Sequence, residues 1–66
     1  MTNRIKVERA ILNLTQEDLA NRISVSRQTI NAMEANKYVP STVLALKIAR
    51  IFGKPVEEIF ILEKAD

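Results

Sequence analysis

The chain of 66 residues contains no cysteine and no histidine. Without cysteine it forms neither a disulfide framework nor a thiolate metal site, and this fits the reducing cytoplasm that we expect for it. No apolar run approaches the length of a membrane span, and the first residues lack the apolar core of a signal peptide. The acidic residues are scattered rather than grouped at metal-ligand or acid–base spacing, so we expect no enzymatic activity, no metal and no cofactor.

The length allows one domain, residues 1–66, with no low-complexity tract. A chain this short buries only about 60% of its unfolded surface, so its stability should be marginal unless a partner subunit adds to it. The net charge of +2 is unevenly distributed. The segment Leu19–Val56 has six basic residues against one acid (+5), whereas Glu57–Asp66 has one lysine against four acids (−3). A phosphate-binding surface requires such a positive segment, although an ordinary solvated surface explains the charge equally well.

Two short helices joined by a tight turn are predicted in the middle of the chain. Thr15 is a suitable N-cap, and the acidic residues that follow it suit the positive end of a helix. Ser26 is a suitable cap for a second helix that runs to about Ala35, and only two residues separate this cap from the end of the first helix at Ile23. Helices joined so closely cross at a steep angle, which is the helix-turn-helix arrangement.

Three further helices complete an all-α fold of five helices. The first is predicted from near Asn3 to Leu12, with Ile5, Ala10, Ile11 and also Val7 expected to face partly or wholly inward. The fourth begins at Ser41, reaches Phe52 and is apolar on most of its circumference, so we expect it to be the central buried helix. Gly53 ends that helix, and Pro55 stands where a short fifth helix should begin.

The region of the two short helices also carries a family resemblance. The residues concerned are Gln16, Leu19, Ala20, Ile23, Val25, Gln28, Ile30, Glu34, Pro40 and Ser41. They resemble the helix-turn-helix of phage-repressor-like regulators of the Cro/C1 or Xre type, and the similarity extends from about Ile5 to Phe60. Within that family, the segments Ser26–Asn31 and Asn36–Tyr38 are similar to the short bacterial repressors of the cytolysin-repressor type. The resemblance implies a DNA-binding fold whose second motif helix, the recognition helix, enters the major groove.

The recognition helix, taken from Arg27 to Ala35, should turn Ile30 and Met33 inward and expose a face of amides and small side chains. Amides can pair bidentately with adenine and arginine with guanine, while alanines allow close approach to the bases. An ordinary polar helix surface is the alternative, but it explains less well why the face lacks the lysine and glutamate usual on exposed helices. The residues expected to read bases are therefore Arg27, Gln28, Asn31 and Ala32.

Phosphate contacts are expected on both sides of the recognition helix. The resemblance implies that Gln16, at the start of the preceding helix, contacts phosphate and braces Gln28. A neutral residue at a helix start is the alternative reading of Gln16. Beyond the recognition helix, the expected phosphate contacts are Asn36, Lys37 and Tyr38, although Tyr38 has the alternative of covering the core.

Three positions bear on the geometry of the motif. The resemblance pairs Arg9 with Glu34, and such a pair would fix the orientation of the recognition helix more than it stabilises the fold. The alternative is that it directs Arg9 towards a phosphate, so both residues are expected as structural support only. Ser24 stands where this family usually has glycine, because the residue adopts positive φ, at a cost of roughly 1 kcal/mol for a non-glycine residue.

The apolar residues at the end of the chain predict that the protein assembles into a homodimer. The apolar run Phe60, Ile61 and Leu62 should lie outside the five-helix core, which favours a homodimer interface. In the short repressors that this chain resembles, the tail forms a strand that pairs with the N-terminal segment, here Met1–Arg4. The expected function is a transcriptional regulator, a homodimeric repressor that binds a pseudo-palindromic site in double-stranded DNA. The alternative is a protein-interaction module of the same fold, such as an antitoxin, which would not need the polar face of the recognition helix.

Overall fold

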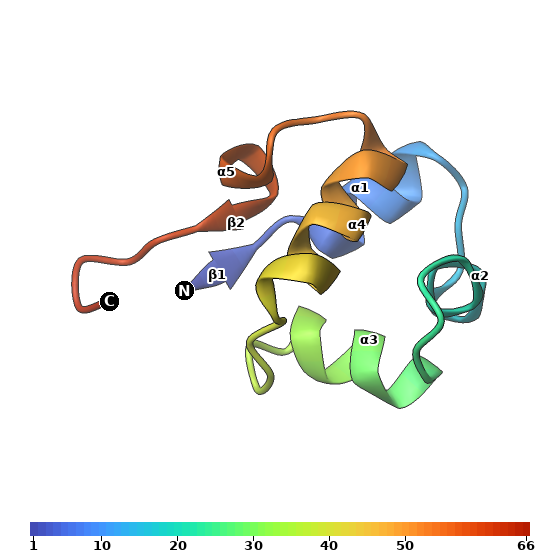
Figure 1. Cartoon of the computed structure of the whole chain (residues 1–66), viewed down its shortest axis with the longest axis horizontal. Coiled ribbons are helices and arrows are strands. Elements are labelled where there is room, and N and C mark those ends of the chain that lie inside the picture. The colour runs from blue at the N-terminus through green and yellow to red at the C-terminus, as the bar shows by residue number, and fades with distance from the viewer.

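The computed structural model describes all residues, 1–66, as five helices and a two-stranded antiparallel sheet (Figure 1). In chain order the elements are β1 (Thr2–Asn3), α1 (Ile5–Ile11), α2 (Gln16–Arg22), α3 (Arg27–Glu34), α4 (Thr42–Phe52), α5 (Val56–Ile59) and β2 (Phe60–Ile61). This confirms the predicted five-helix fold with a helix-turn-helix at α2 and α3 and a short terminal ribbon. None of the helices combines the length and the apolar character needed to cross a membrane.

Hydroxyl side chains cap the helices that matter most for the motif. The Thr15 hydroxyl accepts the Asp18 N–H at 3.0 Å, and the Asp18 carboxylate accepts the Thr15 N–H at 3.0 Å, which completes a capping box. Ser26 and Ser41 each accept the N–H three residues further on at 3.2 Å. Because these caps satisfy backbone donors that have no partner inside the helix, they fix where α2, α3 and α4 begin.

The turn between α2 and α3 is built on a residue in the left-handed region. Ser24 has a φ of 59°, a conformation that the missing glycine would adopt without strain. Asn36, with a φ of 60°, follows the end of α3 in the same conformation, which asparagine tolerates better than serine. Both residues turn the chain sharply, so the ends of α3 are set by local backbone geometry.

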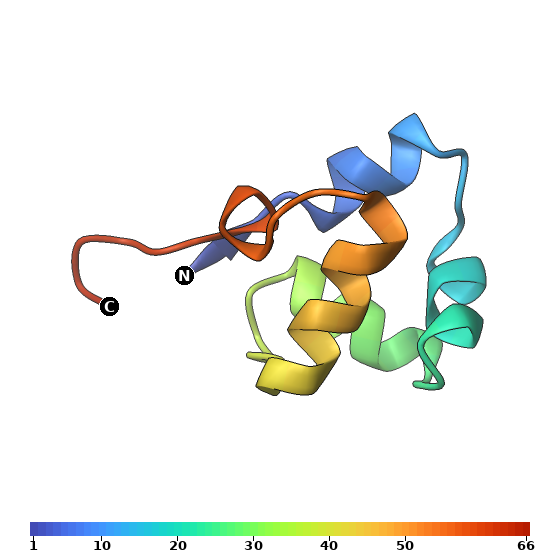
Figure 2. The same ribbon diagram turned by 45° about the horizontal axis from the view of Figure 1, so that its top comes forward.

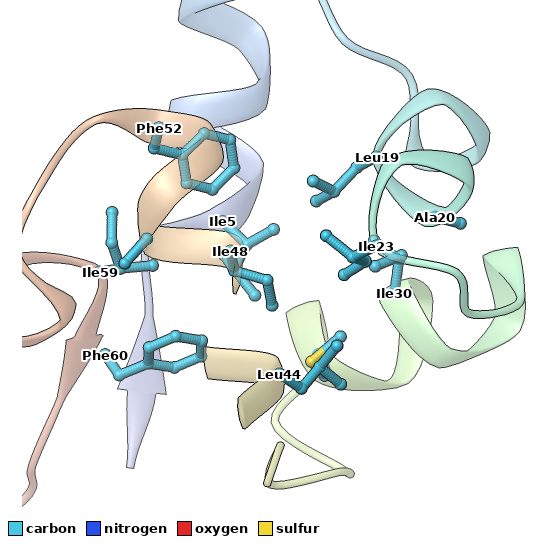
Figure 3. Close-up of a cluster of buried hydrophobic side chains, with 12 residues drawn as sticks. Ile5, Leu19, Ala20, Ile23, Ile30, Leu44, Ile48, Phe52, Ile59 and Phe60 are labelled. Atoms are coloured by element: carbon cyan, nitrogen blue, oxygen red, sulfur yellow. The ribbon is translucent and has the colours of Figure 1, made fainter. Parts of the chain in front are cut away.

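A single core joins the helices to β2 (Figure 3). Its twelve buried residues are Ile5, Leu19, Ala20, Ile23, Ile30, Met33, Leu44, Ile48, Ala49, Phe52, Ile59 and Phe60. Figures 1 and 2 both place α4 between the α2–α3 pair on one side and α5 with the terminal ribbon on the other. The central position predicted for α4 is therefore correct, but its outer face is exposed and carries Val43 and Leu46.

The predicted inward face of α1 was wrong in part. Ile5 is fully buried, but Ile11 is 62% exposed, and Val7 and Ala10 are also exposed. Ile11 lies six residues after Ile5, about 240° further around the helix, so the two cannot share one narrow face. Three residues after Ile5 the buried face continues with a charged residue, Glu8, which is the only buried polar residue of the protein.

An ion pair accounts for the burial of Glu8. The Lys54 Nζ donates a hydrogen bond to Glu8 Oε2 at 2.8 Å, while the side chains of Glu8 and Lys54 are 4% and 42% exposed. Lys54 comes directly before Pro55, which caps α5 without a side-chain hydrogen bond. The pair therefore links α1 to the segment between α4 and α5.

The terminal ribbon pairs the two ends of the same chain. Thr2 lies opposite Ile61 and Asn3 lies opposite Phe60, and for this reason α1 begins at Ile5 rather than at Asn3 as predicted. Phe60 is only 8% exposed and belongs to the core, so the expectation that it lies outside the core was wrong. Ile61 and Leu62 keep their side chains exposed.

Candidate nucleic-acid interface

The helix α3 lies at the surface of the molecule, along its lower edge in Figure 1. Ile30 and Met33 attach it to the core, and both are fully buried. The side chains of Arg27, Gln28 and Asn31 are exposed, and Ala32 is partly buried beside them. These are the four residues predicted to read bases, and the structure brings them together on one helix.

The only acidic residue of α3 is withdrawn from this face. Glu34 accepts hydrogen bonds from Arg9 Nε to its Oε2 at 2.6 Å and from Arg9 Nη2 to its Oε1 at 3.0 Å. Arg9 also donates from Nη1 to the Leu14 carbonyl at 2.8 Å, and the hydrogen bonds with Glu34 are the main reason that the pKa of Arg9 is raised. The exposed residues from Arg27 to Tyr38 thus include positive charge from Arg27 and Lys37 and no free carboxylate.

Gln16 connects α2 to this ion pair and to the exposed face of α3. Its Nε2 donates to Glu34 Oε1 at 3.2 Å and to Asn31 Oδ1 at 3.3 Å. Gln28 is not among its partners, so Gln16 braces a different amide from the one expected. The reason is geometric, because Asn31 and Glu34 are three residues apart and lie on the side of α3 that faces the start of α2.

The hydrogen bonds of Gln16 also restrict how it can meet a phosphate. Both N–H groups of its side chain are used within the protein, so the side chain has only its carbonyl oxygen left, which repels phosphate. In the first turn of α2 the Asp18 N–H is held by Thr15, while the N–H groups of Gln16 and Glu17 have no partners inside the helix and lie at the positive end of its dipole. A phosphate contact at this position would therefore use the main chain.

Past the end of α3, the chain exposes Asn36, Lys37 and Tyr38 in succession. Tyr38 is 46% exposed and is not part of the core, which removes the alternative that it covers the core. Lys37 forms no ion pair within the protein, so its charge faces solvent beside α3. The three residues predicted as phosphate contacts are thus together on one side of the recognition helix.

One residue that supports α3 was not predicted. Asn3 of β1 donates from Nδ2 to the Met33 carbonyl at 2.7 Å and to Asn36 Oδ1 at 3.2 Å, and its Oδ1 accepts the Ile5 N–H at 3.2 Å. It therefore gives a second donor to a carbonyl at the end of α3 that also accepts the Asn36 N–H at 3.0 Å. A single asparagine thirty residues away in sequence gives no periodic signal that could have revealed this contact.

Two short capped helices, a tight turn and an exposed amide-rich face on the second helix define a helix-turn-helix protein. Comparison with protein families agrees, since the pattern described as "Helix-turn-helix" matches residues 5–59. The chain belongs to this helix-turn-helix family, of the Cro/C1 type.

Similar proteins occur in archaea and bacteria. A protein of Methanocaldococcus jannaschii is 59% identical over 63 residues, which cover 96% of each chain. One from Archaeoglobus fulgidus is 50% identical over 66 residues, covering 100% of this chain and 93% of the relative. One from Bacillus subtilis is 44% identical over 64 residues, covering 97% of each chain. All three are named as uncharacterized HTH-type transcriptional regulators.

Proposed function

We propose that this protein is a sequence-specific DNA-binding transcriptional regulator that places α3 in the major groove of double-stranded DNA. The observation that carries the proposal is the exposed face of Arg27, Gln28 and Asn31, from which the single acid of the helix is removed by its ion pair with Arg9. Such a face combines donors and acceptors for base edges with no charge that repels phosphate. The names of the similar proteins support the same function.

Contacts to the DNA backbone flank this face in the proposed complex. The first turn of α2, at Gln16, approaches phosphate through its backbone N–H groups. Lys37 supplies a point charge on the other side of α3, and Asn36 and Tyr38 add hydrogen-bond donors next to it. These contacts would position α3 in the groove without reading sequence, so the four residues of α3 carry the specificity.

We propose further that the protein acts as a homodimer. One recognition helix reads too few base pairs for a usual operator, whereas two related by a twofold axis, about 34 Å apart, read a pseudo-palindromic site. Exposed apolar residues around a hollow beside α4 favour that surface for the dimer contact. A hollow of about 250 Å³ is lined by Met1, Pro40, Thr42, Ala45, Leu46, Val56 and Phe60.

This hollow lies next to other exposed apolar side chains. Val39 and Val43 are the chain neighbours of its lining residues Pro40 and Thr42, and Ile61 and Leu62 follow its lining residue Phe60. A standard interface removes about 800 Å² from each partner, so the hollow and these flanking residues would have to act together. Leu62 is 76% exposed in the single chain and is a suitable side chain to enter the hollow of a second copy.

Repression is the proposed direction of regulation. Occupying a promoter-proximal operator requires only DNA binding and dimerisation. A regulator of this kind would act by excluding polymerase from the DNA.

Selection from a pool of randomised double-stranded DNA with the full-length protein tests the function directly. We expect a pseudo-palindromic site to be enriched. Gln28→Ala should then lower affinity for that site by about 1–3 kcal/mol, roughly 5- to 150-fold, with the circular dichroism unchanged. Asn21→Ala is the matched control, an exposed amide on α2 that lies outside the proposed interface. No enrichment would refute the function, and equal losses on selected and random DNA would refute base readout by Gln28.

Sedimentation of two surface variants tests the dimer contact. Leu46→Glu places a charge in the proposed interface, whereas Ile11→Glu places one on α1, and the two side chains are similarly exposed at 55% and 62%. Because both are exposed, neither substitution should unfold the chain. We expect Leu46→Glu alone to shift the protein towards monomer and to weaken operator binding. The surface assignment is wrong if Ile11→Glu dissociates the dimer and Leu46→Glu leaves it intact.

A further inference from the structure

A chain of hydrogen bonds runs from the partly buried Arg9–Glu34 ion pair to the exposed face of α3. It passes from Arg9 to Glu34, from Glu34 to Gln16, and from Gln16 to Asn31. We infer that this chain fixes the direction of the Asn31 amide, so that Asn31 meets DNA as a hydrogen-bond donor and selects guanine. The inference depends on the proposed function and adds to it the base that Asn31 recognises.

The direction of the chain is set by Glu34. The two ends of a carboxamide have the same shape, so only their partners decide which end faces which way. Arg9 has donors only, and it donates to both oxygens of Glu34, which makes this carboxylate an acceptor. Gln16 must therefore turn its Nε2, and not its Oε1, towards Glu34 Oε1 at 3.2 Å.

The same argument about donors and acceptors fixes the orientation of Asn31. With Gln16 Nε2 fixed by Glu34, its second N–H points to Asn31 at 3.3 Å and requires an acceptor there. Asn31 consequently turns its Oδ1 towards Gln16. Since Oδ1 and Nδ2 diverge from the same carbon atom, the Nδ2 group is the end turned away from α2. Asn31 is exposed, so this donor group is available to a base.

The major groove offers different partners to a donor at each base pair. Guanine presents two acceptors, N7 and O6, next to each other, whereas adenine presents one acceptor, N7, beside the N6 donor. A freely rotating asparagine would pair with adenine through both ends of its amide. When Gln16 holds the Oδ1 of the asparagine, only the two N–H donors of its Nδ2 remain for the base. Two donors fit the two acceptors of guanine. Gln16 is then a positioning residue for specificity.

The experiment uses the full-length protein and the site selected from the randomised DNA pool. Competition binding against all single-base variants of that site identifies the base pair whose discrimination disappears in Asn31→Ala. We expect this pair to be G·C, and we expect 7-deazaguanine, which lacks the N7 acceptor, to weaken binding of the natural protein at this position. Gln16→Ala should lower the preference for guanine over adenine there by about 5-fold or more, because the Asn31 amide becomes free to turn over.

A double-mutant cycle separates orientation from the phosphate contact proposed at Gln16. A phosphate contact affects all sequences equally, so it cancels in the ratio of affinities for guanine and adenine. In the Asn31→Ala background, Gln16→Ala should leave that ratio unchanged, and Asn21→Ala should leave it unchanged in both backgrounds. An A·T pair at the Asn31 position, or a Gln16→Ala effect that persists without Asn31, would overturn the orientation mechanism while the proposed function stands. Failure to enrich any site would refute both.

Discussion

Lys54→Met should destabilise the protein much more than the substitution of a half-exposed lysine usually does. Lys54 Nζ supplies the only side-chain hydrogen bond of Glu8, whose side chain is 4% exposed. Removing one partner of a fully buried ion pair costs about 3–5 kcal/mol, because the other charge stays buried without compensation. Lys54 is 42% exposed, so water reaches this pair and screens it. We therefore expect a loss of about 2 kcal/mol.

That loss is large for a chain of this size. At about 0.05–0.15 kcal/mol per residue, the expected free energy of unfolding is roughly 3–10 kcal/mol. Urea unfolding followed by circular dichroism should show a lower midpoint with an unchanged slope, and thermal unfolding should show a melting temperature lower by about 8–16 °C. Lys47→Met on the exposed face of α4 is the matched control, since Lys47 forms no ion pair, and it should change stability by less than about 0.5 kcal/mol.

The double variant Glu8→Leu with Lys54→Met tests the cause. It buries no charge, so it should recover most of the stability that Lys54→Met loses. If Lys54→Met behaves like Lys47→Met, Glu8 does not depend on Lys54. If the double variant is as unstable as the sum of the single variants, the burial of an unpaired carboxylate is not the reason for the loss.

Three further predictions concern the motif itself. Ser24→Gly should raise the melting temperature, because glycine adopts a φ of 59° without strain, and a gain of up to about 1 kcal/mol is expected; a loss would contradict the strain at Ser24. The hydrogen bond from the Thr15 N–H lowers the pKa of Asp18 below its ordinary 3.8. Ionised Asp18 therefore stabilises the fold fully at pH values above 3.8, and this stabilisation is lost as the pH falls through the lowered pKa. The difference in melting temperature between the natural protein and Asp18→Ala should therefore shrink between about pH 7 and pH 2, and a constant difference would exclude the capping carboxylate as its source. Lys37→Ala should weaken binding to selected and random DNA alike and flatten the slope of log affinity against log salt by about one, and an unchanged slope would rule out a phosphate contact.

Much of the fold was predictable because its determinants are local. Thr15, Ser26 and Ser41 cap the residues that follow them, and Ser24 sits in a turn of fixed length, so the positions of α2, α3 and α4 can be read from neighbouring residues. The apolar face of α4 extends over three turns and gives a clear periodic signal. In contrast, α1 has only seven residues, too few for the pattern to decide which residues face inward.

The polar contacts that support the candidate site were harder to predict. Glu8 is buried because of Lys54, which is 46 residues away, and Gln16 turns to Asn31, which is 15 residues away. Such contacts depend on how the helices cross, and neither periodicity nor spacing encodes them. The resemblance correctly predicted the pair of Arg9 and Glu34, but it suggested Gln28 rather than Asn31 as the partner of Gln16.

The hydrogen bonds of Asn3 connect the two ends of the chain to α3, the helix proposed to read DNA. Asn3 lies in β1, which is held in place by its pairing with β2, and its amide binds the last turn of α3 and Asn36. A fusion, a cleavage or a bound protein that separates the two strands would withdraw that amide and leave the Met33 carbonyl with only the Asn36 N–H, at 3.0 Å, as its donor. Operator affinity would then change although none of the residues proposed to read bases had been altered, so the terminal ribbon offers a point of control remote from the groove.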